Sequence, residues 1–205
     1  RMRRWIGLLV AALGFALAGQ AHAAALKGDC PDNYVVKAGL NTDFPHEGQK
    51  RAFLVYPPQG VTGPAPVFVP LTGSVESTMD NLTVARSGAT SLMSAQGFLV
   101  IGPVRQCAGQ DPDLKGGVCN GPGHGGWNWN PWNEGRAAGP AGDQWKNDEG
   151  PDSTFLIAAV KCAAKSFPVD ARRVYLGGIS SGGTMTNRAL AFRSDFWAGG
   201  LPISG

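Results

Sequence analysis

The chain has 205 residues, of which 43% are hydrophobic and 16% are charged. The hydrophobic fraction suffices for a packed core and excludes a wholly disordered chain, while the low charged fraction argues against a coiled coil. Glycine (30 residues) and proline (15 residues) are frequent but follow no three-residue period. This composition excludes collagen and favours a loop-rich globular fold of about one domain.

The net charge of +3 comes from the start of the chain. Arginines there precede the apolar run 5–18, after which Ala21 and Ala23 form a small-x-small cleavage site. The pattern predicts a secretory signal peptide at residues 1–23, because an apolar run of about 14 residues is too short to span a membrane. Three of the 18 basic residues and no acidic residue lie in this leader, so residues 24–205 hold 15 of each. We therefore expect a secreted protein with no nucleic-acid partner and no membrane contact after cleavage.

The hydrophobic pattern in the rest of the chain predicts strands that alternate with helices. Residues 24–48 look irregular, and a turn is expected at 168–170. Strands are expected at 51–56, 67–71, 98–102, 173–179 and 199–204, and helices at 76–95, 152–166 and 181–192. This alternation indicates an α/β fold with a mostly parallel sheet flanked by helices.

Four cysteines form an even set, which fits export to an oxidising compartment. Cys107 and Cys119 bracket a glycine-rich stretch and form the favoured pair, which leaves Cys30 with Cys162, although three connectivities are open. A zinc site is the alternative, but the sequence has no CxxC motif and only two histidines after the leader. We expect no metal and no cofactor.

Residues 105–150 are rich in glycine and tryptophan, and a long loop inside a compact domain is usually functional. Trp127 and Trp129 are candidates for a hydrophobic platform that binds a polymer chain or an aromatic acyl group. The alternative is a packed cluster that orders the loop, and the sequence leaves both open.

The segment Gly178-Ile179-Ser180-Ser181-Gly182 follows the G-x-S-x-G pattern, between a predicted strand and a predicted helix. In that context the serine lies on a sharp turn with its hydroxyl exposed above the sheet. A side chain at Gly178 or Gly182 would crowd the neighbouring strand and helix. We therefore predict Ser180 as a nucleophile, since the lysine of a phosphate loop and the glycine spacing of a dinucleotide site are both missing.

Acyl transfer also requires N–H donors for the developing oxyanion. The N–H of Ser181, at the start of the predicted helix, is one candidate. The second normally comes from the loop after an earlier strand, where Thr72-Gly73-Ser74 stands, so we expect the N–H of Ser74 to serve. The alternative for this segment is an ordinary glycine turn.

With these motifs the chain resembles the polyhydroxybutyrate-depolymerase-like esterases, secreted α/β-hydrolases that include feruloyl and acetylxylan esterase relatives. The resemblance runs from about Arg51 to Gly205 and is strongest around Ser180. It is carried by the segments 98–103, 127–129, 139–140, 169–170, 173–175, 178–185, 196–198 and 203–205.

The resemblance implies an α/β-hydrolase fold, Ser180 as nucleophile, and Ser74 and Ser181 as oxyanion donors. That family usually has His-Gly where this chain has Thr72-Gly73, so the oxyanion loop is expected to be tuned differently. We expect a monomer that hydrolyses ester bonds through an acyl-enzyme, with a polyhydroxyalkanoate polyester, an insoluble polymer or its oligomers, as first candidate substrate. The alternatives are a feruloyl or acetyl esterase on plant cell-wall polysaccharide, and a non-catalytic secreted polymer-binding protein with a degenerate triad.

The catalytic triad of this fold follows the order serine, acid, histidine. Only 25 residues follow Ser180, and they contain Asp195 but no histidine. We therefore expect the acid and the histidine beyond Gly205, with residues 24–205 as the N-terminal portion of a C-terminally truncated α/β-hydrolase domain. The alternative is that His124 acts from upstream. Asp195 is expected to be a surface or turn residue.

Overall fold

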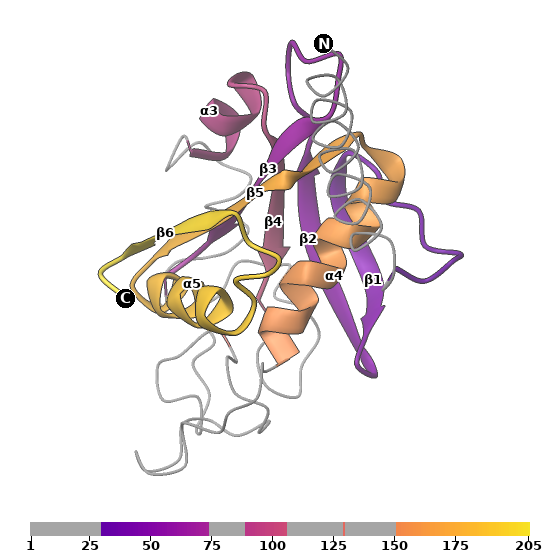
Figure 1. Cartoon of the computed structure of the whole chain (residues 1–205). Helices are drawn as coiled ribbons and strands as arrows, with labels where there is room; N and C mark the ends of the chain where they lie inside the picture. The colour runs from indigo at the N-terminus through magenta and orange to yellow at the C-terminus, as the bar shows by residue number, and fades with distance from the viewer. Residues whose placement is uncertain (1–29, 74–88, 106–128, 130–150) are drawn as a thin grey trace, which may run out of the picture.

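The structure is a computed structural model that describes residues 30–73, 89–105, 129 and 151–205 (Figure 1). The predicted signal peptide and the predicted Cys107–Cys119 pair lie outside these residues, as do Ser74, Trp127 and His124. Within the described ranges, no helix combines the length and the apolar character that a membrane span requires.

Among the described residues, six strands form one mixed sheet in the order β1-β2-β4-β3-β5-β6. They are β1 (Gly39–His46), β2 (Gln49–Tyr56), β3 (Ala65–Leu71), β4 (Leu99–Val104), β5 (Val169–Ile179) and β6 (Gly199–Ile203). The pairs β1–β2 and β2–β4 are antiparallel, whereas β4, β3, β5 and β6 run parallel to one another. The prediction of a mostly parallel sheet is confirmed.

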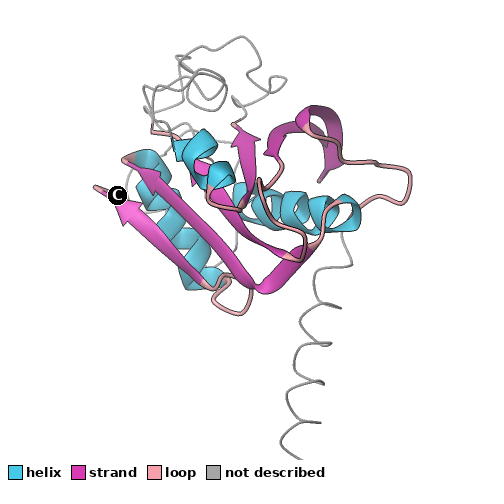
Figure 2. Ribbon diagram, turned by 90° about the horizontal axis from the view of Figure 1, so that it is seen from above, coloured by secondary structure: helices cyan, strands magenta, loops and turns pink. Residues whose placement is uncertain are grey.

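The helices that the structure describes are α3 (Ala89–Ala95), α4 (Pro151–Ser166) and α5 (Ser181–Phe192). Helices α4 and α5 contact each other and lie over the same face of the sheet (Figure 1). In the sheet, the chain moves from β3 to β4 in one direction and from β4 to β5 in the opposite direction. Because crossovers between parallel strands are right-handed, these two connections lie on opposite faces of the sheet, which places α3 on the face opposite to α4. Figure 2 shows the C-terminus beside the end of the edge strand β6.

Two local expectations are wrong. Residues 39–46 form an edge strand rather than irregular chain, and residues 169–170 belong to β5 rather than to a turn. Strand β1 has a register shift between Asn41 and Phe44, with Asp43 at a φ of 56°. This bulge breaks the period-two alternation by which a half-buried strand is recognised.

The core lies between the central strands and the α4–α5 layer. Alternate residues of β3 are buried, and residues 155–160 of α4 are buried without interruption. This apolar stretch packs α4 against the sheet, whereas the end of the helix, at Lys165 and Ser166, is exposed.

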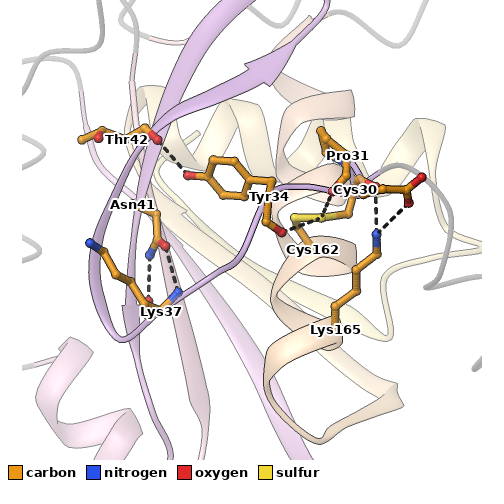
Figure 3. The surroundings of a disulfide bond; sticks show 9 residues. Cys30, Pro31, Tyr34, Lys37, Asn41, Thr42, Cys162 and Lys165 are labelled. Carbon is orange, nitrogen blue, oxygen red and sulfur yellow. Dashed lines mark hydrogen bonds and ion pairs between the residues drawn. A yellow bond between two sulfur atoms is a disulfide. The ribbon is translucent and has the colours of Figure 1, made fainter.

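A disulfide ties the segment that precedes β1 to α4 (Figure 3). Cys30 and Cys162 are bonded across 132 residues, with their Cα atoms 4.7 Å apart. Lys165, about one turn further along α4, donates a hydrogen bond to the Cys30 carbonyl at 2.9 Å. This bond is the second pair of the favoured connectivity, in which Cys107 is bonded to Cys119 and Cys30 to Cys162.

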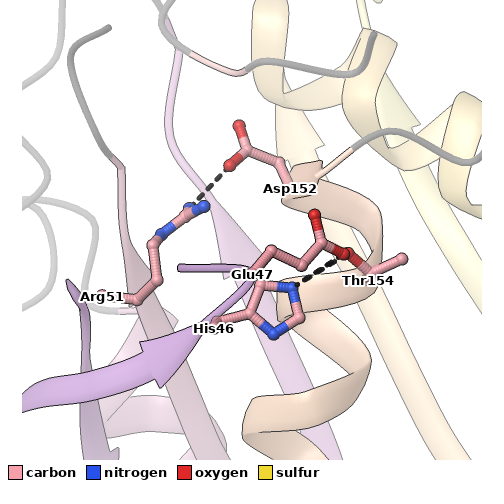
Figure 4. A network of polar contacts seen from close by, with 5 residues as sticks. All are labelled: His46, Glu47, Arg51, Asp152 and Thr154. Atoms are coloured by element: carbon pink, nitrogen blue, oxygen red, sulfur yellow. Dashed lines mark hydrogen bonds and ion pairs between the residues drawn. The ribbon is translucent and has the colours of Figure 1, made fainter. Parts of the chain in front are cut away.

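A buried ion pair attaches the start of α4 to β2 (Figure 4). Arg51 donates to the Asp152 carboxylate at 2.6 Å, and the two side chains are only 2% and 3% exposed. The Arg51 guanidinium also lies over the Phe155 ring, 4.0 Å from its centroid. The helix begins at Pro151, one residue before the expected start. Asp152 lies in the first turn, where the helix dipole favours a carboxylate.

Candidate active site

Ser180 occupies the turn that joins β5 to α5, and its side chain is exposed. Its backbone has φ 55° and ψ −121°, a conformation that non-glycine residues rarely adopt and that costs about 1–3 kcal/mol. The turn is held on both sides, since the Ser180 N–H donates to the Ile203 carbonyl at 2.8 Å and the Ser180 carbonyl accepts from the Thr184 N–H at 2.9 Å. The predicted strand–serine–helix arrangement is therefore present.

The two glycines of the motif are required by the close approach of β3. A Cβ on Gly178 would lie 2.5 Å from the Leu71 carbonyl oxygen, and a Cβ on Gly182 would lie 2.8 Å from the Thr72 carbonyl oxygen. Real Cβ atoms essentially never come closer than 3.0 Å to such atoms. The steric role predicted for Gly178 and Gly182 is confirmed, and the neighbour that imposes it is the end of β3.

The candidate oxyanion donors follow from the same contact. Ser181 is the first residue of α5 and is buried, so its N–H belongs to the first turn, where N–H groups have no acceptor within the helix. The positive end of the helix dipole also lies here. Leu71 is in register with Gly178, so the segment Thr72-Gly73 follows β3 at the carboxyl ends of the parallel strands, where Ser180 also lies. Ser74 lies outside the described residues, and its role stays a prediction.

Two buried side chains contact the segment after β3. Trp129 donates its indole N–H to the Thr72 carbonyl at 2.8 Å, and Arg105 donates to the Gly73 carbonyl at 3.2 Å. Trp129 is only 3% exposed, so it offers no open face to a polymer and the structure favours the packing alternative for this residue. Sequence reasoning missed Arg105, whose only signal is a cation directly after the apolar run of β4.

Asp195 lies on the surface, as expected. Arg193 donates to its carboxylate at 3.0 Å, and this hydrogen bond holds the pKa of Asp195 below its ordinary value. Asp195 follows the far end of α5, a helix of 12 residues that is about 18 Å long. The structure therefore does not bring this carboxylate to Ser180.

His46 is the only histidine among the residues that the structure describes, and its side chain takes part in polar contacts between β1 and α4 (Figure 4). Its Nε2 lies 2.9 Å from the Thr154 hydroxyl, which donates to Glu47 at 2.6 Å. Strand β1 is four places from β5 in the sheet, a separation of about 19 Å, so His46 cannot reach Ser180. The described part of the chain also holds no cluster of three or more His, Cys, Asp or Glu residues that could bind a metal.

The sequence is similar to one protein family and to two curated hydrolases. A model of the prolyl oligopeptidase family matches residues 139–205. An oxidized polyvinyl alcohol hydrolase from Pseudomonas sp. is 68% identical over 180 residues, which are 88% of this chain and 48% of that protein. The protein of the same name from Sphingopyxis sp. (strain 113P3) is 57% identical over 176 residues, which are 86% of this chain and 48% of the relative. The chain thus spans about half the length of the curated relatives it matches.

Solved structures show the same similarity. Native pOPH is 69% identical with a TM-score of 0.74, and the match covers 87% of this chain and 56% of that one. The complex of a serine-to-alanine variant of pOPH with pNPB is 68% identical, also with a TM-score of 0.74, and covers 87% and 53%. An acetyl xylan esterase from Aspergillus awamori, 18% identical with a TM-score of 0.54 over 80% and 50% of the two chains, shares the fold alone.

The sheet order, the flanking helices and the serine turn define a chain with the α/β-hydrolase fold, as predicted. Its relatives carry the name of oxidized polyvinyl alcohol hydrolases. The finer resemblance to polyhydroxybutyrate depolymerases stays a prediction.

The contact between β3 and the serine turn makes a direct prediction for Gly182→Ala. The new Cβ overlaps the backbone of Thr72, so we expect a loss of about 1–3 kcal/mol in the free energy of unfolding, together with a loss of Ser180 reactivity. The matched control is Gly199→Ala in β6, where the new Cβ lies 3.7 Å from the Tyr175 ring, an ordinary contact. Urea unfolding measures both variants, and equal stability of the two would contradict the steric account.

Proposed function

We propose that the full-length protein is a secreted serine hydrolase in which Ser180 attacks carbonyl groups of esters and related compounds. One observation carries the proposal: an exposed serine in a rarely adopted backbone conformation at the start of a helix. Backbone strain of this kind persists where the surrounding structure holds it and is common at catalytic nucleophiles. The names of the relatives support a hydrolase.

The proposed reaction proceeds through an acyl-enzyme. The Ser180 hydroxyl oxygen bonds to the carbonyl carbon while its proton passes to a histidine, which we expect elsewhere in the full-length protein. The carbonyl oxygen becomes an oxyanion that accepts hydrogen bonds from the N–H groups of Ser181 and Ser74. The leaving group departs with the proton, and water then attacks the acyl-enzyme and frees Ser180.

We propose oxidized polyvinyl alcohol as the polymer substrate, because the relatives are named for it. Oxidation of secondary alcohols on alternate backbone carbons produces pairs of ketones two bonds apart. Attack of Ser180 on one ketone cleaves the carbon–carbon bond between the two carbonyl groups, and the departing carbon leaves as an enolate that takes up the proton. The oxyanion is the same as in ester hydrolysis, so one site serves both reactions.

Export is part of the proposal. The predicted leader at residues 1–23 supports it, and so does the Cys30–Cys162 disulfide, since structural disulfides form and persist in oxidising compartments. A polymer too large to enter a cell has to be cleaved outside the cytoplasm, which agrees with this location.

The role of Ser180 is tested by the rate at which the protein hydrolyses p-nitrophenyl butyrate. We expect Ser180→Ala in the full-length protein to lower kcat by about 10⁴-fold or more, because no other group replaces the nucleophile. Ser194→Ala is the matched control, an exposed serine beyond the far end of α5, and it should keep the wild-type rate. Hydrolysis by the Ser180 variant at the wild-type rate would refute the mechanism, and an inactive wild-type protein would favour the non-catalytic polymer-binding alternative.

The substrate class is tested by comparing how fast different polymers are degraded at equal enzyme concentration. We expect the chain length of oxidized polyvinyl alcohol, followed by size-exclusion chromatography, to fall with time, and the unoxidized polymer to stay intact because it has no ketone. Clearing of a polyhydroxybutyrate suspension or release of ferulate, with no change in oxidized polyvinyl alcohol, would favour the polyester or cell-wall alternative.

A further inference from the structure

Helix α5 has glycine at its second and third positions, Gly182 and Gly183. Glycine is a poor helix former, so a helix whose first turn holds two glycines has a packing reason for them. The end of β3 accounts for Gly182. The atoms nearest to a Cβ on Gly183 belong to a different part of the chain, residues 203–205, which we call the β6 exit segment.

The β6 exit segment lies directly on the first turn of α5, a helix that packs against β6 (Figure 1). A Cβ on Gly183 would be 2.7 Å from the carbonyl oxygen of Ile203 and 3.0 Å from the backbone N and Cα atoms of Gly205. The contact is reciprocal, since a Cβ on Gly205 would overlap the backbone of Gly183 and the Thr184 nitrogen. Both positions therefore require glycine.

The same contacts hold the backbone of Ser180. The Ile203 carbonyl that lies against Gly183 accepts the Ser180 N–H at 2.8 Å. The Thr184 N–H, in the peptide group that Gly205 covers, donates to the Ser180 carbonyl at 2.9 Å. A methyl group on Gly183 fits only if the Ile203 carbonyl moves away, and that movement takes the acceptor from the Ser180 N–H.

Ser204 turns the chain from β6 onto α5. Strand β6 ends at Ile203, and Ser204 has a φ of 49°, in the left-handed region. An extended residue here would continue in the direction of the strand, whereas the left-handed residue bends the chain so that Gly205 reaches Gly183. Non-glycine residues keep such a conformation only where the surrounding structure holds it, and they cluster at functional sites.

We propose that Gly183, Ser204 and Gly205 are positioning residues that fix the backbone of Ser180 from the side of β6. The inference rests on the proposed function of Ser180. None of the three contacts the reacting atoms: they act through the Ile203 carbonyl and the first turn of α5, which set the direction of the Ser180 hydroxyl. Ser204 contributes its backbone conformation, and its own hydroxyl has no part.

Gly183→Ala in the full-length protein is the sharpest test. We expect kcat for p-nitrophenyl butyrate to fall about 10²-fold, the loss that a displacement of about 1 Å at a reacting group causes, while KM changes less than about twofold. The rate at which a fluorophosphonate labels Ser180 should fall with kcat, because both depend on the position of the hydroxyl. Gly205→Ala should show the same pattern.

The chain offers a matched control in Gly200→Ala. Gly200 also lies between β6 and α5, but its new Cβ would first meet the end of the Leu190 side chain, at 2.9 Å. This variant should lose stability in urea and keep the wild-type kcat per folded molecule. If Gly183→Ala keeps the wild-type kcat, or if both variants lower kcat equally, the positioning role is overturned.

Substitutions of Ser204 separate its conformation from its hydroxyl. Ser204→Gly should keep the wild-type kcat, because glycine adopts a positive φ at no steric cost. Ser204→Val should lose kcat, because a β-branched residue strongly disfavours this conformation. Equal loss in both variants would assign the role to the hydroxyl and overturn the proposal, as would a wild-type kcat in both. Should Gly183→Ala not fold, this pair decides alone.

The wild-type protein separates failure of the inference from failure of the proposed function. If it hydrolyses p-nitrophenyl butyrate through Ser180 and the variants at Gly183 and Ser204 keep its kcat, the inference fails and the proposed function stands. If the wild-type protein has no Ser180-dependent hydrolysis, the proposed function fails and the inference fails with it.

Discussion

The site depends on one close approach between two segments of backbone. The end of β3 passes so near the turn between β5 and α5 that neither Gly178 nor Gly182 has room for a Cβ atom. This contact keeps the turn sharp and leaves the Ser180 side chain exposed in its rarely adopted conformation. It also brings the carbonyl of Thr72 to the first turn of α5. The turn that carries Ser180 and the segment after β3 are therefore parts of one packing arrangement, and a change at either glycine affects both.

Sequence reasoning predicted this part of the molecule well, because the relevant information is local. An apolar run, the pattern G-x-S-x-G and a helix-forming run follow one another within residues 173–192, and the observed α5 has the predicted bounds. Sterics at a sharp strand-to-helix turn are enough to predict that both positions require glycine. Asp195 was recognised as a surface residue because it follows a helix and precedes a strand, and its contact with Arg193 agrees with that.

Sequence reasoning missed features that join residues far apart in the chain. Arg51 and Asp152 are 101 positions apart, and nothing local shows that two charged residues form a buried pair. The hydrogen bond from Trp129 to Thr72 spans 57 positions and cannot be read from a tryptophan-rich composition. Strand β1 escaped recognition for another reason, since the bulge at Asp43 breaks its alternation. Local patterns thus predict the turn that carries Ser180, while tertiary contacts determine how the segment after β3 is held.

The central claim is that Ser180 is the reactive nucleophile, and covalent labelling tests it most directly. The full-length protein is treated with a fluorophosphonate, digested and examined by mass spectrometry, with urea-unfolded protein as a control for non-specific reaction. We predict one label per folded molecule, on Ser180, and none in the unfolded sample, because reactivity depends on the folded turn. A label on another residue, or loss of ester hydrolysis with Ser180 unmodified, would contradict the account.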